Sequence, residues 1–193
     1  MKRIISCLLI LAMVFALAGC SVLKSKSEII YEGANVPEDT EKVKIEKSSG
    51  DREFLVGNCH VYIHDDASLI SGLDHEKLLD VVAQYSEKIS FNILFLTYDD
   101  AQGKSTKVYS DDYMDNLFPY RAHDNIAFVI DMDNREYYIN TMGNAIEWLN
   151  DEEIDKALDK GYDDIVEEEY ARCLQKVADY CLKELAREQS KQK

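Results

Sequence analysis

The chain has 193 residues, of which 22 are Lys or Arg and 37 are Asp or Glu, for a formal net charge of −15 at pH 7. This length suits one domain with a short extension. The excess of acidic residues excludes a nucleic-acid-binding protein, whose affinity depends on neutralising phosphates with Lys and Arg. The remaining explanations of the negative charge are binding of a cation, binding of a basic partner, or plain solubility.

The first twenty residues have the three parts of a secretory signal. Lys2 and Arg3 supply positive charge, residues 4–17 are apolar apart from Ser6, and the segment ends in Leu-Ala-Gly-Cys20. The apolar run is shorter than the roughly 20 residues that a membrane-spanning helix needs, and the order of parts is typical of a signal peptide. The ending resembles the lipobox of bacterial lipoproteins. We therefore expect a signal peptide at 1–19 and a lipid on Cys20 that anchors the protein on the extracytoplasmic face of the cell membrane.

The segment after this cysteine predicts a tether. Residues 20–57 are rich in Ser, Lys and Glu and show no sustained hydrophobic periodicity, which is typical of a flexible chain. Loss of residues 1–19, with two basic and no acidic side chains, takes the net charge from −15 to −17. Because such a surface repels anionic lipid headgroups, the lipid alone would hold the protein at the membrane. We expect the folded domain at 58–187 and a polar tail at 188–193.

From Cys59 onward the hydrophobic pattern predicts alternating strands and helices. In chain order these are a strand at 59–64, a helix at 71–89 that begins at Ser71, a strand at 91–97, a helix at 105–117, a strand at 126–130, a strand at 135–141 after a turn at Asp133-Asn134, a helix from Asn150 that Gly161 ends, and a long helix at 166–185. Two strands are apolar throughout, as in sheets covered on both faces. The pattern predicts an α/β fold, a three-layer α/β/α sandwich with a small mixed sheet and a terminal β-hairpin.

Three aspartates crowd the predicted helix at 105–117. Asp115 stands four residues after Asp111 and three after Asp112, so all three project from adjoining faces. Like charges at these spacings destabilise a helix by a few tenths of a kcal/mol. A divalent cation is the simplest compensation, and oxygen ligands favour Ca²⁺, with Mg²⁺ as the alternative. A solvated acidic face explains the same spacing, so both interpretations stay open.

Other candidate groups are weaker. Asp131 and Asp133 end a buried strand and resemble the D-x-D nucleophile motif of haloacid-dehalogenase-type phosphatases, although Asn134 closes a hairpin where that motif continues into a loop. His60 and His64 share one face of a strand without a third ligand nearby.

Three cysteines remain besides Cys20. Their odd number excludes a complete disulfide framework. Whether Cys59 pairs with Cys173 or Cys181 stays open.

Four segments together resemble the TPM-domain family. They are VYIHDDASLIS at 61–71, YSDDYMD at 109–115, Asp124-Asn125 before an apolar strand, and MDNREYYINTMG at 132–143. The resemblance implies an α/β/α sandwich at a membrane and a Ca²⁺-type site that uses Asp65 with the helix aspartates. That set is Asp65, Asp111, Asp112 and Asp115, to which we add Asp124 from the loop before the strand. The chain departs from the family where Asn125 replaces a usual glycine.

The leading hypothesis is a membrane-tethered TPM-like domain that binds Ca²⁺ and serves as an interaction, assembly or quality-control module for an envelope protein. The alternative is a metal-dependent acid phosphatase, an activity that the resemblance also implies, using the same aspartates. A phosphatase needs basic groups to hold phosphate. Arg121 and His123 follow the acidic helix, but no cluster of Lys or Arg surrounds them, which favours binding over catalysis.

Overall fold

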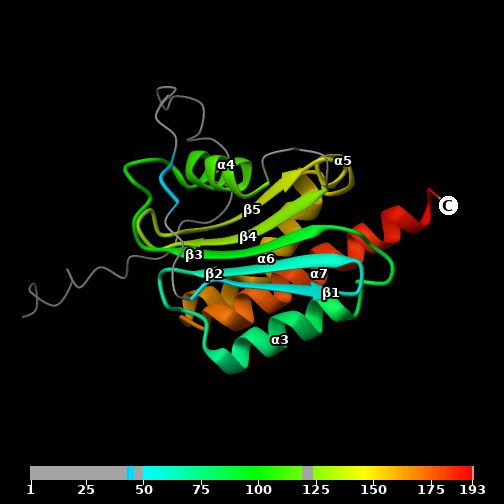
Figure 1. Ribbon diagram of the computed structural model, residues 1–193, viewed down its shortest axis with the longest axis horizontal. Helices are drawn as coiled ribbons and strands as arrows, with labels where there is room; N and C mark the ends of the chain where they lie inside the picture. The colour runs from blue at the N-terminus through cyan, green and yellow to red at the C-terminus, as the bar shows by residue number, and fades with distance from the viewer. Residues whose placement is uncertain (1–42, 46–49, 119–123, 193) are drawn as a thin grey trace, which may run out of the picture.

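The computed structural model describes residues 43–45, 50–118 and 124–192. Within these residues the strands form one five-stranded sheet in the order β1-β2-β3-β4-β5 (Figure 1). The strands are β1 (Arg52–Val56), β2 (Cys59–Asp65), β3 (Asn92–Tyr98), β4 (Asn125–Asp131) and β5 (Glu136–Met142). The helices are α3 (Gly72–Ala83), α4 (Thr106–Leu117), α5 (Ala145–Trp148), α6 (Asp151–Val166) and α7 (Tyr170–Ser190).

The sheet is mixed, as predicted. Strands β2, β3 and β4 are parallel, whereas β1 and β5 pair antiparallel with their neighbours at the two edges. The hairpin of β4 and β5 is the terminal hairpin expected from the turn at Asp133-Asn134. The register places Asp65, Thr97 and Ile130 side by side at one end of the sheet.

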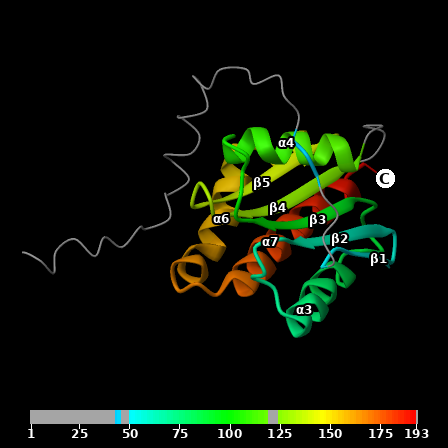
Figure 2. The ribbon, with the colours of Figure 1, turned by 60° about the vertical axis from the view of Figure 1, so that its left-hand side comes forward.

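Helices cover both faces, which confirms the α/β/α class. One face carries Val61, Ile63, Phe95 and Phe128 and packs against α3, α6 and α7. The other face carries Leu94, Leu96 and Val129 and packs against α4. Figure 2 shows α4 on one side of the sheet and α3, α6 and α7 on the other.

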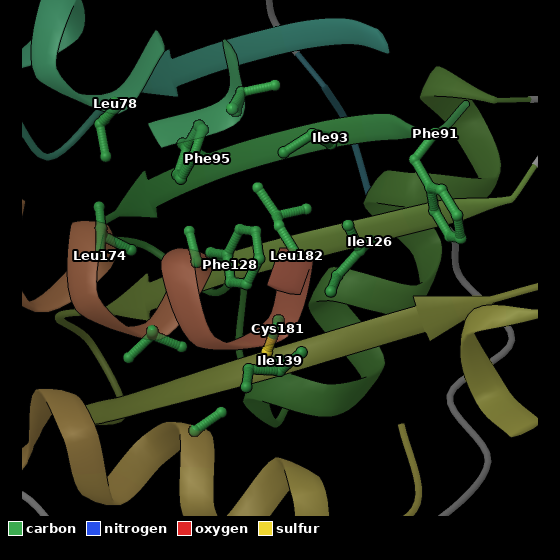
Figure 3. Packing of buried hydrophobic residues seen from close by; sticks show 14 of the residues in the cluster. Leu78, Phe91, Ile93, Phe95, Ile126, Phe128, Ile139, Leu174, Cys181 and Leu182 are labelled. Atoms are coloured by element: carbon green, nitrogen blue, oxygen red, sulfur yellow. The ribbon is translucent and has the colours of Figure 1, made fainter. Parts of the chain in front are cut away.

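The larger core lies between the sheet and α7. Leu174, Cys181 and Leu182 of α7 point at the sheet (Figure 3). There Phe95 and Phe128 stack with ring centroids 5.4 Å apart. The apolar stripe predicted on the last helix is therefore the stripe that buries this face of the sheet.

The two crossovers between parallel strands differ in hand. Both move the chain one strand in the same direction, but β2 connects to β3 through α3 on one face, and β3 connects to β4 through α4 on the other. One of the two must therefore be the uncommon left-handed form. As a result, the chain leaves β2 and β3 toward opposite faces, and adjacent strand ends that diverge in this way open a crevice between them.

The domain begins earlier than predicted. Residues 52–56, which we assigned to the tether, form the edge strand β1, whose Phe54 and Val56 pack against the core. A two-residue turn at Gly57-Asn58 joins β1 to β2, and Gly57 has a φ of +55°. Gly-Asn is a common hairpin turn, but a five-residue edge strand with polar alternate positions resembles a tether in sequence.

Three helix boundaries also differ. Helix α6 runs through Gly161 to Val166, so the prediction that Gly161 ends it was wrong, and Val166 closes α6 instead of opening α7. The helix predicted at 71–89 ends at Ala83, and turns follow it. Helix α7 extends to Ser190, into the predicted polar tail. Among the described residues, no helix combines the length and the apolar run required to cross a membrane.

Candidate functional site

A crevice opens at the carboxyl ends of β2 and β3, where the two crossovers diverge. Its cavity has a volume of about 390 Å³. Asp66 follows β2 and contributes one wall, and Asp99 and Asp100 follow β3 and contribute another. The remaining lining consists of three tyrosines, a glutamine of the loop after β3 and a short N-terminal segment, namely Tyr98, Tyr109, Tyr113, Gln102, Lys44 and Ile45.

The tyrosines of the crevice stay protonated. Burial, then the carboxylates of Asp66 and Asp100, raise the pKa of Tyr109 to about 12. Burial also raises the pKa of Tyr113 above its ordinary value, and its hydroxyl makes a 2.7 Å hydrogen bond with Nδ1 of the buried His64. At neutral pH these phenols are hydrogen-bond donors and not nucleophiles.

Asp131 lies under the crevice and is structural. Its carboxylate has no exposed surface. It accepts hydrogen bonds from the Tyr98 hydroxyl at 2.9 Å, from Oγ1 of Thr106 at 2.8 Å, and from the backbone and side-chain nitrogens of Asn134, both at 2.8 Å. A carboxylate so covered cannot attack a substrate, so the D-x-D segment joins β3, α4 and the β4–β5 turn and is not a phosphatase nucleophile.

Asp65 binds the backbone of the loop between β2 and α3 and does not line the crevice. Its carboxylate accepts from the backbone N–H groups of Leu69 at 2.8 Å and Ile70 at 2.9 Å, and from the Thr97 hydroxyl. Side chains alternate between faces along a strand, so Asp65 lies on the same side as Val61 and Ile63, which is the α3 side. The aspartates of α4 lie on the opposite side of the sheet.

Those helix aspartates point in two directions. Asp111 binds Nζ of Lys107 at 2.6 Å and Nδ2 of Asn140 at 2.8 Å. Asp111 and Asp115 line a second cavity of about 520 Å³ between α4 and β5. Asp112 instead accepts the backbone N–H of Val43 at 3.1 Å.

Asp124 lies at the other end of the sheet. It accepts from the backbone N–H of Asn144 at 2.8 Å and from its side-chain amide at 3.0 Å. Asp65 is level with Ile130 in the sheet register, six residues beyond Asp124, which is about 20 Å along a strand.

The five predicted ligands therefore do not converge in the structure. Asp111 and Asp115 share a cavity, and Asp65, Asp112 and Asp124 each lie elsewhere. No group of three or more His, Cys, Asp or Glu side chains in the described part of the chain is arranged to hold a metal ion. Arg121 and His123, which we considered as phosphate ligands, lie outside the described residues, as do Cys20 and the predicted signal peptide.

Sequence reasoning missed Asp99 and Asp100. A signal was available, because the acidic pairs Asp65-Asp66 and Asp99-Asp100 each stand where a parallel strand ends. Two such pairs behind neighbouring parallel strands meet at one sheet edge.

The cysteines take no part in the crevice. Cys59, Cys173 and Cys181 are buried, and no disulfide joins any of them. Burial, then the carboxylate of Asp164, raise the pKa of Cys173 to about 12, so this thiol is inert at neutral pH.

Comparison with known families fits this architecture. A family model described as TPM domain matches residues 63–184, which is more than half of the chain. The chain belongs to the TPM domain family. The TPM match runs from β2 into α7 and includes Asp66, Asp99 and Asp100, whereas β1 and residues 43–45 precede it. No curated protein matches the sequence.

Proposed function

We propose that this TPM domain is a binding module, held outside the cytoplasmic membrane by a lipid on Cys20, and that its crevice binds a divalent cation. The observation that carries the proposal is the gathering of Asp66, Asp99 and Asp100 around one cavity at the carboxyl ends of β2 and β3. Ligand sites in open α/β sheets lie at this position. The domain would also engage an envelope protein.

The chemistry of these side chains suits a hard cation. Carboxylate oxygens are the ligands that Ca²⁺ prefers, and Ca²⁺ takes six to eight of them. The three carboxylates line one cavity, but no three ligand side chains of the described residues are already gathered into a metal-binding group. Binding would therefore have to draw these side chains together, and water would complete the shell. We therefore expect weak affinity, with a Kd on the order of 10⁻⁴–10⁻³ M, as in extracellular Ca²⁺ modules.

The same lining disfavours the rival activity, hydrolysis of a phosphomonoester. Among the described residues that line the crevice, Lys44 is the only basic one. A phosphoryl group needs several positive charges around it, and the buried Asp131 is saturated by its four donors. Binding accounts for this charge pattern better than catalysis does.

Calcium titration of the wild type and two double variants tests where the cation binds. We expect isothermal calorimetry of residues 20–193 to show saturable Ca²⁺ binding, and the variant Asp99→Asn/Asp100→Asn to lose it. The matched control is Asp111→Asn/Asp115→Asn, which removes the same charge from α4 outside the crevice and should bind as the wild type does.

The opposite pattern, with binding lost only in the α4 variant, would place the cation where the helix spacing predicted it. Absence of binding at millimolar Ca²⁺ in the wild type would refute cation binding. Hydrolysis of p-nitrophenyl phosphate that depends on Asp99 and Asp100 would establish the phosphatase instead.

Lipidation is tested separately. In a bacterial host given radiolabelled palmitate, the full chain should incorporate label and fractionate with membranes. The variant Cys20→Ala should incorporate no label, because the lipid is attached through the sulfur of that residue. Label in the Cys20→Ala protein would refute the anchor.

A further inference from the structure

Residues 43–45 lie on the domain as an extended peptide lies on its receptor. The backbone N–H of Val43 donates to Asp112 of α4 at 3.1 Å. The backbone N–H of Lys44 donates to Oε1 of Gln102 at 3.1 Å, and Nε2 of Gln102 donates to the carbonyl of Lys44 at 2.9 Å. In both ribbon views this short blue segment lies beside α4 (Figures 1 and 2).

The main chain of the segment is recognised independently of its sequence. The side-chain amide of Gln102 pairs with both the backbone N–H and the backbone carbonyl of one residue, Lys44, as a neighbouring β-strand would. The backbone of Gln102 itself has a left-handed conformation, with a φ of +54°. Its own N–H donates to Asp100 at 2.8 Å, which fixes the loop.

The side chains of the segment supply the selectivity. Val43 is 5% exposed and belongs to the apolar cluster under α4. Lys44 is exposed and lines the acidic crevice with Asp66, Asp99 and Asp100. Ile45 packs against the same apolar cluster. The three positions thus form an apolar–basic–apolar pattern that matches an apolar pocket beside an acidic wall.

We infer that the groove between α4 and the loop 99–104 is a binding site for an extended peptide of apolar–basic–apolar pattern from a partner protein, and that residues 43–45 are its built-in competitor. The inference deepens the proposed binding function by naming the class of partner. It does not require the cation. The segment precedes the part of the chain that matches the TPM family.

A competition experiment on the full mature chain tests this inference. The labelled peptide has the sequence of residues 39–49, and its binding is followed by fluorescence anisotropy. In the wild type the tethered segment competes at millimolar effective concentration, so the peptide should bind weakly. The variants Lys44→Glu and Val43→Asp/Lys44→Glu should each bind it at least about tenfold more tightly.

Two controls separate recognition from nonspecific attraction of a basic peptide to an acidic protein. A peptide carrying Val43→Asp keeps its Lys residues and should not bind the released variants. Addition of Gln102→Ala to a released variant should weaken binding, because the amide that pairs with the peptide backbone is gone. Lys44→Glu changes an exposed side chain and keeps the test valid if the double variant does not fold.

The inference is refuted if released variants bind the peptide no better than the wild type, or if the Val43→Asp peptide binds equally well. Released variants that elute as a dimer, with no effect of added peptide, would assign the groove to a second copy and not to a partner. Calcium titration of the wild type decides the cation proposal separately, since it involves no peptide.

Discussion

Replacing Asp131 with alanine is expected to lower the free energy of unfolding by about 4 kcal/mol, because buried donors that lose their acceptor each cost about 1–3 kcal/mol. The Tyr98 hydroxyl, the Thr106 hydroxyl and both nitrogens of Asn134 would lose their acceptor. Through these bonds Asp131 joins the end of β3, the start of α4 and the turn that opens β5. Urea denaturation followed by circular dichroism measures the change.

The matched control is Asp99→Ala, which removes an exposed aspartate one residue beyond the neighbouring strand. Surface changes of this kind stay within about 0.5 kcal/mol. The isosteric Asp131→Asn keeps the volume and one acceptor and should cost about half as much as alanine. Equal stabilities for Asp131→Ala and Asp99→Ala would show that the buried network contributes nothing, and would reopen a functional role for the D-x-D segment.

Much of the fold could be predicted because its local signals agree with its packing. The middle residues of β3 and β4 are apolar, and both strands are covered on both faces. Ser105 and Asn150 cap α4 and α6, where their side chains accept from Val108 and Glu153. These signals depend on neighbouring residues only, so a sequence displays them directly.

The location of the site could not be predicted in the same way. Helical spacing correctly put Asp111 and Asp115 together, and they share a cavity. It could not reveal that Asp65 lies on the other side of the sheet, because that depends on which face each crossover takes. Opposite handedness of the two crossovers is a property of the tertiary structure, and it is also what brings Asp66 and Asp99 to one crevice.

A glycine at position 161 has two possible structural explanations, the end of a helix or close packing between helices. Glycine after a periodic segment commonly ends a helix, and the sequence alone supported that interpretation. In the structure Gly161 is buried inside α6, where the helix passes close to α7. A Cβ atom at this position would lie 2.6 Å from Sγ of Cys173 and 2.7 Å from Cγ2 of Val177. Glycine is required at this position because α6 and α7 approach each other closely, and not because the helix ends there.

Gly161→Val is therefore expected to lower the free energy of unfolding by about 3 kcal/mol, at the upper end of overpacking costs. Alanine in a helix is favoured over glycine by about 1 kcal/mol, so Gly161→Ala should cost less, about 1–2 kcal/mol net. Gly72→Ala is the matched control, since nothing lies within 4 Å of a Cβ there, and it should be neutral or stabilising.

Chemical denaturation of these variants tests whether the close approach of α6 and α7 limits the side chain at position 161. If space at position 161 were not limiting, alanine would be tolerated there as well as at 72, and both variants would be as stable as the wild type or more so. If close approach decides, the two alanine variants differ in sign. Adding Cys173→Ala to Gly161→Ala removes the nearest atom, so the double variant should be less destabilised than the sum of the two single changes. Strict additivity would place the cost elsewhere than in the contact with Cys173.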